Sequence, residues 1–417
     1  MSDASRKHEI RCPIHGFINF NDWEKAVIDS PEFQRLRRIR QLAFTEFIYP
    51  GATHTRFEHS LGVMHVATRM YEALTQRYGD DFIKTFSYDK GGFDRDCQLL
   101  RFAALLHDVG HGPLSHASED LMPFKAPGQR YKHEQYSAAI VRSKLRATID
   151  QHPLSENSNL KADEIADFLE GKSTSKRRVF WRELLDGQMD ADRADYLLRD
   201  SHHAGVAYGH YDLDRIIATL AVVPDEGNGL RVGVRKGGWH AAESLVIARY
   251  MMFTQVYFHQ TRVAFNFLLR NILKAILPGG LFPSPEGAGL DQYLQWDDWS
   301  VLGAVAGGCA GEAGRQLRER DHPRNVYQTN EVTTQDDIKK LDAIQSALGE
   351  RVVAVESAGK SWYKIGTSDI PVAMPDGVQP LSDLSSIVKN MRETNQQLVF
   401  VRSQDANEAR AIVERMK

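Results

Sequence analysis

The sequence predicts a mainly α-helical protein with a helical core and a smaller α+β lobe at its carboxyl end. Size is the first observation, since 417 residues with 42% hydrophobic content can bury a large core. The second is the segment 99–106, which is apolar on nearly every side and is typical of a buried helix. The third is a change of pattern near Asp336, beyond which helices alternate with short extended segments.

Helices account for most of the first 280 residues. Pro31 favours the first turn of a helix, so the run 22–42 is predicted to hold two helices. The run 239–277 contains neither Gly nor Pro and ends at Pro278, which predicts one long helix or two abutting ones. A hairpin is expected around Gly227, where a Gly-Asn-Gly turn separates two extended runs. Further helices are predicted to begin near residues 56 and 131 and to cover 163–170 and 190–200.

The carboxyl-terminal lobe is predicted from a different pattern. It starts with a helix near Asp336 and ends with another, and between them we expect extended segments at 351–356, 362–365 and 397–402 and a helix at 381–393. Together with a polar amino-terminal stretch, this suggests a flexible arm (1–12), a helical core domain (13–280) and the α+β lobe (281–417).

Charge, cysteine content and hydropathy indicate which partners and which cellular compartment to expect. A net charge of -3 gives no general attraction to nucleic acid. The basic stretch 172–182 contains Phe180 and Trp181 and leaves weak single-stranded nucleic acid binding open, with a solvated turn as the alternative. Three scattered cysteines favour a reducing cytoplasm. No apolar run of about 18 residues lacks charges, so no membrane contact is expected.

One short stretch concentrates the chemistry. His107, Asp108, His111 and His116 fall within ten residues, directly after the predicted buried helix. A lone buried histidine is usually a hydrogen-bonded core residue, but four ionisable groups together favour a metal site. Further ligands must come from elsewhere in the chain. The candidates are His59, at the start of a helix, and the face shared by Asp192, Tyr196 and Asp200 at every fourth residue.

These motifs identify a family resemblance. The chain resembles the HD phosphohydrolase superfamily and, more narrowly, its deoxynucleoside triphosphate triphosphohydrolase branch, from about residue 13 to about residue 275. The shared strings are PIHG (13–16), SPEFQRLR (30–37), YPGA (49–52), RFEHSLGV (56–63), HDVGHGPLSH (107–116), HEQ (133–135) and DYLLRDSHH (195–203).

The resemblance implies a metal-dependent hydrolase that converts a dNTP and water to a deoxynucleoside and inorganic triphosphate. It implies a divalent metal held by His59, His107, Asp108 and Asp192. Mixed histidine and carboxylate ligation suits Mn, Mg, Fe, Ni or Zn, and the sequence does not choose among them.

The resemblance also assigns the remaining site residues. His116 would be the proton donor or base, with Glu119 behind it where the family has Asp, and His133 would complete the cluster with His111. The implied substrate contacts are Arg56, His111 and Arg193 to phosphate, Tyr196, Asp200 and Gln41 to the sugar, and His259 in the pocket wall.

Two positions depart from the family pattern. Gln255 stands where the family has a phosphate-binding Arg, and Val263 stands where it has a sugar-stacking Tyr. Gln cannot make the bidentate charged contact of Arg, although Arg262 or Arg249 could compensate.

A regulatory site is implied near the amino terminus. Asp29, Gln34 and Arg37 match positions that hold a guanine nucleotide at a subunit interface in the family, which implies a guanine or deoxynucleotide activator and a homo-oligomer, dimeric or tetrameric. The alternative is a helix cap at Asp29 beside a basic surface.

Two other function classes stay open. One is a different HD chemistry, acting on a modified or cyclic nucleotide or on single-stranded nucleic acid ends. The other is a nucleotide-sensing regulatory protein without catalysis. The nature of the released product separates them.

Overall fold

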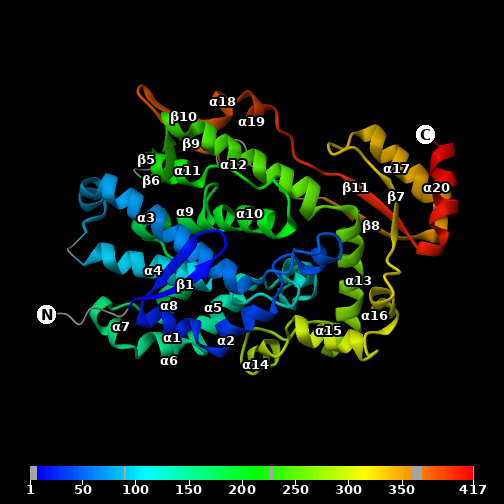
Figure 1. Cartoon of the computed structure of the whole chain (residues 1–417), viewed down its shortest axis with the longest axis horizontal. Helices are drawn as coiled ribbons and strands as arrows, with labels where there is room; N and C mark the ends of the chain where they lie inside the picture. Colours follow the sequence, from blue (N-terminus) through cyan, green and yellow to red (C-terminus); the bar gives the residue numbers. More distant parts are fainter. Residues whose placement is uncertain (1–6, 89–90, 226–228, 359–368, 417) are drawn as a thin grey trace.

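The computed structural model describes residues 7–88, 91–225, 229–358 and 369–416, and it confirms the mainly α-helical fold (Figure 1). The helices are α1 (Asp22–Ile28), α2 (Pro31–Gln34), α3 (Arg56–Phe86), α4 (Gly92–Leu106), α5 (His133–Ser143), α6 (Arg146–Asp150), α7 (Pro153–Ser158), α8 (Ala162–Leu169), α9 (Lys176–Asp186), α10 (Ala191–Ala204), α11 (Leu213–Thr219), α12 (Trp239–Met252), α13 (Gln260–Ile276), α14 (Gly289–Leu294), α15 (Asp298–Ala306), α16 (Gly311–Arg318), α17 (Gln335–Leu348), α18 (Leu381–Leu384), α19 (Ser386–Asn390) and α20 (Ala406–Arg415).

The helices α3, α4 and α10 form the framework of the site. Helix α3 starts at a capping box in which the Thr55 side chain and Glu58 satisfy each other's backbone N–H groups. Helix α10 starts at Asp190, whose carboxylate accepts the N–H of Arg193. Both α4 and α10 pack on α3, so the carboxyl end of α4 and the amino ends of α3 and α10 meet. Chemistry-bearing residues gather at this junction.

The strands form four small sheets. They are β1 (His8–Cys12), β2 (Gly16–Phe20), β3 (Phe124–Ala126), β4 (Gln129–Arg130), β5 (Leu220–Asp225), β6 (Gly229–Arg235), β7 (Arg324–Gln328), β8 (Val352–Ser357), β9 (Pro371–Met374), β10 (Gly377–Pro380) and β11 (Gln397–Val401). The sheets are the hairpins β1-β2 and β3-β4, a four-stranded sheet in the order β10-β9-β6-β5, and a three-stranded sheet in the order β7-β11-β8.

The flexible arm expected over residues 1–12 is wrong for residues 8–12. These residues form β1, which pairs antiparallel with β2. The hairpin is docked on the helices because Ile18 and Cys12 are buried in the main core and β2 contacts α3. The sequence of the hairpin is polar and alternating, so its packing on the helices could not be predicted from hydrophobicity.

The predicted long helical segment is two helices. A π-helical turn (Phe253–Tyr257) follows α12, and the chain leaves helical geometry before the His259 side chain caps α13. Among the described residues, no helix has the length and apolar character needed to cross a membrane.

The cores divide the chain differently from the boundary expected at residue 280. Helices α14 to α16, strand β9 and helices α18 and α19 bury residues in the main core, and β9 pairs parallel with β6. The α+β lobe consists of 324–357 and 397–416, with its own core between α17, α20 and the sheet β7-β11-β8, and Leu398 and Phe400 of β11 pack against Val263 and Ala264 of α13. In Figure 1 this lobe carries the carboxyl terminus, opposite the amino terminus. The strand expected at 362–365 and the turn at 226–228 lie outside the described residues.

The aromatic residues of the basic stretch do not form a stacking surface. Phe180 and Trp181 are each 1% exposed and lie in the main core. Arg178 pairs with Glu164, and Arg177 pairs with Asp96. Stacking of nucleic acid bases on these rings is therefore excluded.

Candidate active site

The four predicted metal ligands meet at the helix junction. His59 comes from the first turn of α3, His107 and Asp108 directly follow α4, and Asp192 lies in the first turn of α10. The Nε2 atom of His59 is 3.0 Å from Asp192 Oδ1 and 3.5 Å from Asp108 Oδ2. The Nε2 atom of His107 is 3.4 Å from Asp108 Oδ1 and 3.7 Å from Asp192 Oδ1. The structure thus brings together residues from three distant parts of the chain.

The hydrogen bonds behind the two histidines suit metal binding. His107 Nδ1 is 2.8 Å from the carbonyl oxygen of Ala104, and His59 Nδ1 is 2.8 Å from Asp195 Oδ2. Both partners only accept hydrogen bonds, so Nδ1 carries a proton, and in the neutral form that binds a metal Nε2 would carry the lone pair. The two Nε2 atoms are buried and lack hydrogen-bond partners among the described residues. Buried nitrogens of this kind, beside two carboxylates, fit a divalent cation.

Electrostatics at this cluster also favours a positive charge. Burial alone would lower the pKa of His59, but Asp192 and Asp195 outweigh burial and raise it to about 10. Burial alone would raise the pKa of the Asp192 carboxyl, but His107 and His59 hold it below its ordinary value. The carboxylates therefore remain charged and attract a cation.

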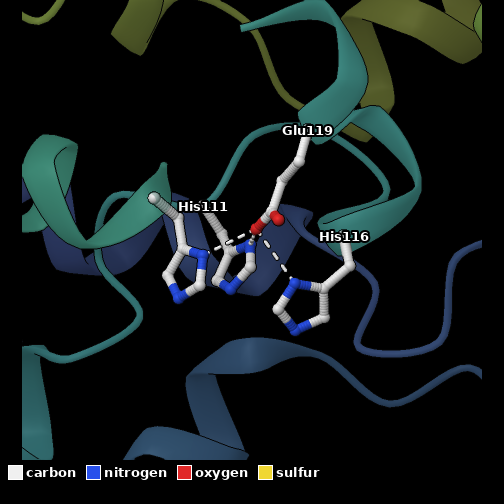
Figure 2. A group of neighbouring side chains, drawn as sticks. His111, His116 and Glu119 are labelled. Carbon is white, nitrogen blue, oxygen red and sulfur yellow. Dashed lines mark hydrogen bonds and ion pairs between the residues drawn. The ribbon is translucent and has the colours of Figure 1, made fainter. Parts of the chain in front are cut away.

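A second cluster consists of His111, His116, Glu119 and His133, and Figure 2 shows His111, His116 and Glu119 turned toward one another. Glu119 Oε1 is 2.9 Å from His116 Nδ1 and 2.6 Å from His133 Nδ1. The ring of His111 stacks on the ring of His133 with centroids 3.8 Å apart. His111 Nε2 is 3.2 Å from Asp108 Oδ1, so this residue links the second cluster to the metal ligands.

The histidines of the second cluster differ in how readily they hold a proton, and burial lowers the pKa of His116 although Glu119 opposes this. Burial would raise the pKa of Glu119, but His116 and His133 hold it well below its ordinary value. Burial opposes a charge on His133, yet Glu119 raises its pKa. Burial and the charge of Arg56 lower the pKa of His111 well below its ordinary value. The charged form is thus favoured at His133 and disfavoured at His111, on which it stacks. His111, His116, Glu119 and His133 offer ligand atoms that lie within 4.8 Å of one another, so this cluster is a second group that could hold a metal ion, although the rings of His111 and His133 are nearly parallel.

Two backbone features place this cluster. A Cβ atom at Gly110 would lie 2.2 Å from the backbone nitrogen of Ser137, so Gly110 permits the close approach of α5, which begins at His133. Leu114 and Ser115 both adopt left-handed backbone angles, with φ of 59°, just before His116. Such strained conformations need support. Here Leu114 N–H donates to Asp298 at 2.7 Å, and the Ser115 hydroxyl accepts from Arg56 at 2.9 Å.

The predicted phosphate-binding arginines are both paired with carboxylates. Arg56 is buried and pairs with Asp108, so its charge lies beside the metal ligands. Arg193 pairs with Asp190 and also donates to the carbonyl of Gly187. The other predicted phosphate contact, His111, faces Asp108 as described above.

The predicted sugar-binding residues lie together at the other end of α10. Asp200 Oδ1 is 2.7 Å from His54 Nε2, and its Oδ2 accepts from the Tyr257 hydroxyl at 2.6 Å. The ring of Tyr196 lies 6.1 Å from that of Tyr257. Gln41 has a buried side-chain oxygen that finds no hydrogen-bond partner within the described part of the chain, an acceptor available to a substrate hydroxyl.

His259 occupies a structural position. Its Nδ1 accepts the backbone N–H of Thr261 at 3.2 Å and thereby caps α13. Its ring lies 6.3 Å from that of Tyr49, whose hydroxyl donates to the carbonyl of Gln255.

The two departures from the family pattern differ in exposure. Gln255 is exposed, whereas Val263 is buried. Arg262 donates to the carbonyl of Tyr257 and keeps a buried Nε without a partner, while Arg249 lies 3.0 Å from the side-chain oxygen of Gln188.

Several residues that shape the site were not predicted. Asp195 contacts the candidate metal ligand His59 and is itself contacted by His15, and His54 and Tyr257 contact Asp200. The available signal was Asp195 itself, three residues after Asp192 on the same helix. His15, His54 and Tyr257 show no periodic relation to the residues that they contact.

The predicted regulatory residues lie on the surface near α1 and α2. Asp29 pairs with Lys25, Gln34 donates to the carbonyl of Ile28 at 2.8 Å, and Arg37 donates to Gln34 at 2.8 Å. The side-chain cap of α2 is Ser30, so the alternative role of Asp29 as that cap is wrong.

Comparisons with known proteins agree with this geometry. The HD domain matches residues 56–200, and the HD associated region matches residues 211–401. An uncharacterized protein of Methanocaldococcus jannaschii is 36% identical over 404 residues, which are 93% of this chain and 77% of that protein. The crystal structure of a hypothetical protein from Aquifex aeolicus superposes with a TM-score of 0.79 at 26% identity, covering 98% of this chain and 100% of the other.

Several similar proteins carry functional names. The deoxynucleoside triphosphate triphosphohydrolase SAMHD1 of Homo sapiens is 29% identical over 68% of this chain and 46% of its own length. Its homolog in Dictyostelium discoideum is 31% identical over 64% of this chain and 49% of its own length. The chain thus aligns with about half the length of these two proteins. The family resemblance is confirmed, and this chain belongs to the HD superfamily of metal-dependent phosphohydrolases.

Proposed function

We propose that the protein is a deoxynucleoside triphosphate triphosphohydrolase that converts a dNTP and water to a deoxynucleoside and inorganic triphosphate. The observation that carries this proposal is the position of Asp108 between two clusters. Its carboxylate faces the metal ligands His59 and His107 and also lies 3.2 Å from His111 in the second cluster. The functional names of the two relatives support the same reaction.

The reaction breaks the bond between the α-phosphorus and the 5′ oxygen, and the oxygen of water joins the phosphorus. A bound divalent cation would neutralise phosphate charge and activate water at this place. Arg56, beside Asp108, contributes a further positive charge. His116 holds Nδ1 against Glu119, and from its protonated form Nε2 would give a proton to the departing 5′ oxygen, while the proton released by the attacking water would restore the protonated form.

Recognition of the sugar is assigned to the other end of α10. Tyr196 provides an aromatic surface, and Asp200 is oriented by His54 and Tyr257. Gln41 offers the buried acceptor for the 3′ hydroxyl. Binding at this end would fix the α-phosphate relative to His116.

The test is product analysis. Purified protein is incubated with each of the four dNTPs, singly and mixed, in Mn and in Mg, and the products are separated by anion-exchange chromatography. We expect equal amounts of deoxynucleoside and triphosphate. Release of monophosphate with pyrophosphate would contradict the proposed bond cleavage.

A second candidate is another HD phosphohydrolase reaction on a modified or cyclic nucleotide or on a single-stranded nucleic acid end. It is favoured by Gln255, which presents an exposed amide where the family has a charged Arg. This candidate would be supported if the protein does not hydrolyse dNTPs but hydrolyses a cyclic nucleotide or shortens an oligonucleotide.

Regulation and setting are part of the same proposal. Asp29, Gln34 and Arg37 are proposed to bind a guanine nucleotide or a deoxynucleotide and to couple it to a homo-oligomer, dimeric or tetrameric. The three cysteines are free, which supports action in a reducing cytoplasm.

A further inference from the structure

A histidine in the turn of the amino-terminal hairpin contacts Asp195, the carboxylate that orients the candidate metal ligand His59. His15 lies between β1 and β2, and its Nε2 is 2.6 Å from Asp195 Oδ1. Its side chain is only 3% exposed, and that of Asp195 is fully buried. The other oxygen of this carboxylate, Oδ2, is 2.8 Å from His59 Nδ1. One carboxylate therefore joins a residue of the hairpin to a candidate metal ligand.

Four donors fix this carboxylate. Besides His15 and His59, Arg199 donates to Oδ1 through Nη2 at 2.7 Å and to Oδ2 through Nε at 2.8 Å. Burial alone would raise the pKa of Asp195, but these partners hold it well below its ordinary value. Gly62 makes room for the group, because a Cβ atom there would lie 1.9 Å from Asp195 Oδ1.

The hairpin also contacts Arg199, one of the residues that donate to the Asp195 carboxylate. Arg199 Nη2 is 3.5 Å from the sulfur of Cys12, the last residue of β1. Cys12 and Ile18 are buried in the main core, so the hairpin is packed against α3 and α10 on apolar as well as polar contacts. Movement of the hairpin would therefore remove the contact of His15 with Asp195 and the contact of Cys12 with Arg199 at once.

We propose that His15 is a positioning residue of the metal centre, acting through Asp195 on His59, and that docking of the amino-terminal hairpin and metal binding are thermodynamically linked. Residues that orient a ligating histidine typically change metal affinity by about 10- to 100-fold. Linkage is reciprocal, so a bound metal should also hold the hairpin in place. The inference concerns the metal site and does not depend on which nucleotide is hydrolysed.

The first experiment measures Mn²⁺ affinity of the full chain by calorimetric titration, without substrate. His15→Phe keeps an aromatic ring but removes the donor, and we expect about 10- to 100-fold weaker binding. His15→Gln restores an N–H donor and should recover most of the affinity. The matched control is His8→Phe on the same hairpin, since His8 contacts Asp22 and should leave Mn²⁺ affinity unchanged.

A merely structural role for His15 gives a different result. The metal-free variants would then lose thermal stability, while every variant that folds would bind Mn²⁺ like the wild type. Unchanged Mn²⁺ affinity in His15→Phe overturns the proposal.

Hydrogen exchange on the wild-type chain tests the reciprocal effect and remains decisive even if His15→Phe does not fold. Mn²⁺ should slow exchange of the backbone amides of β1 and β2, and exchange in the distant sheet β7-β11-β8 should not change. Equal exchange of the hairpin with and without Mn²⁺ contradicts the linkage.

Discussion

Two neighbouring clusters use the same residue types in opposite ways. In the first, His59 and His107 bond outward through Nδ1, to Asp195 and Ala104, and their buried Nε2 atoms face two carboxylates without hydrogen-bond partners. In the second, His116 and His133 turn Nδ1 inward to Glu119, which occupies both nitrogens. Among the described residues, the first arrangement leaves two nitrogens unpaired beside two carboxylates, whereas the second pairs His116 and His133 with Glu119 and leaves His111 with buried ring nitrogens that lack hydrogen-bond partners.

The difference teaches which cluster binds a cation and which moves protons. A buried nitrogen without a partner is costly unless a ligand completes it, and in the first cluster two such nitrogens face two carboxylates, which suits a cation. An imidazole that is hydrogen-bonded through Nδ1 to a carboxylate keeps a defined tautomer and offers Nε2 for proton transfer. The following predictions separate the two roles, beginning with the largest expected effect.

Asp192→Ala should abolish both metal binding and turnover. A bound metal contributes several kcal/mol of transition-state stabilisation, so the rate should fall by about three orders of magnitude or more. Metal content is measured by mass spectrometry and folding by circular dichroism. Asp186→Ala, which removes an exposed carboxylate paired with Arg182, is the control and should bind metal normally. Full metal occupancy in folded Asp192→Ala would remove Asp192 from the ligand set.

His116→Ala should lower kcat by about two to four orders of magnitude, the usual contribution of a positioned acid or base. Metal content and KM should remain near those of the wild type, because His116 is not a ligand. His210→Ala, at an exposed position, serves as the control. If turnover persists in His116→Ala, the proton donor is another residue, and His133→Ala becomes the variant to measure.

Glu119→Asp should have a smaller effect on the same step. The shorter side chain cannot keep both His116 and His133 at their present distances, and a displacement of about 1 Å costs up to about 100-fold in rate. We expect a loss of kcat of about 10- to 100-fold with unchanged metal content. Loss of metal in this variant would mean that the second cluster also takes part in metal binding.

Asp29→Ala should leave the basal rate and the free energy of unfolding nearly unchanged, within about 0.5 kcal/mol, since its pair with Lys25 is exposed. What should disappear is the response to nucleotide, measured as mass by light scattering and as activity with and without GTP or a dNTP mixture. Lys25→Ala breaks the same ion pair but keeps the carboxylate, so it should still respond. A wild-type chain that responds to no nucleotide removes the regulatory proposal.

The sequence predicts the helical core well because its signals are local. Periodic apolar residues and the Pro31 start mark helices, and the motif at 107–116 marks the site. Contacts between distant segments leave no such signal. Strand β9 pairs with β6 in the four-stranded sheet, although more than a hundred residues separate the two strands in the sequence. It therefore belongs to the main core and not to the lobe.

The same distinction applies to the site. His59, His107, Asp108 and Asp192 are predicted because the family motif contains them, and the structure brings them together. His15 and Asp195 are 180 residues apart, and only the folded chain shows that they share a hydrogen bond. Glu119 is visible in the sequence next to His116, but its hold on His133 depends on the close approach of α5 at Gly110.

The most direct test is the position of a bound metal, located by anomalous diffraction from crystals soaked in Mn²⁺. The account predicts one strong peak among His59 Nε2, His107 Nε2, Asp108 and Asp192, and none at Glu119. A peak surrounded by His111, His116, Glu119 and His133, with the first cluster empty, would reverse the assignment of the two clusters and contradict the account.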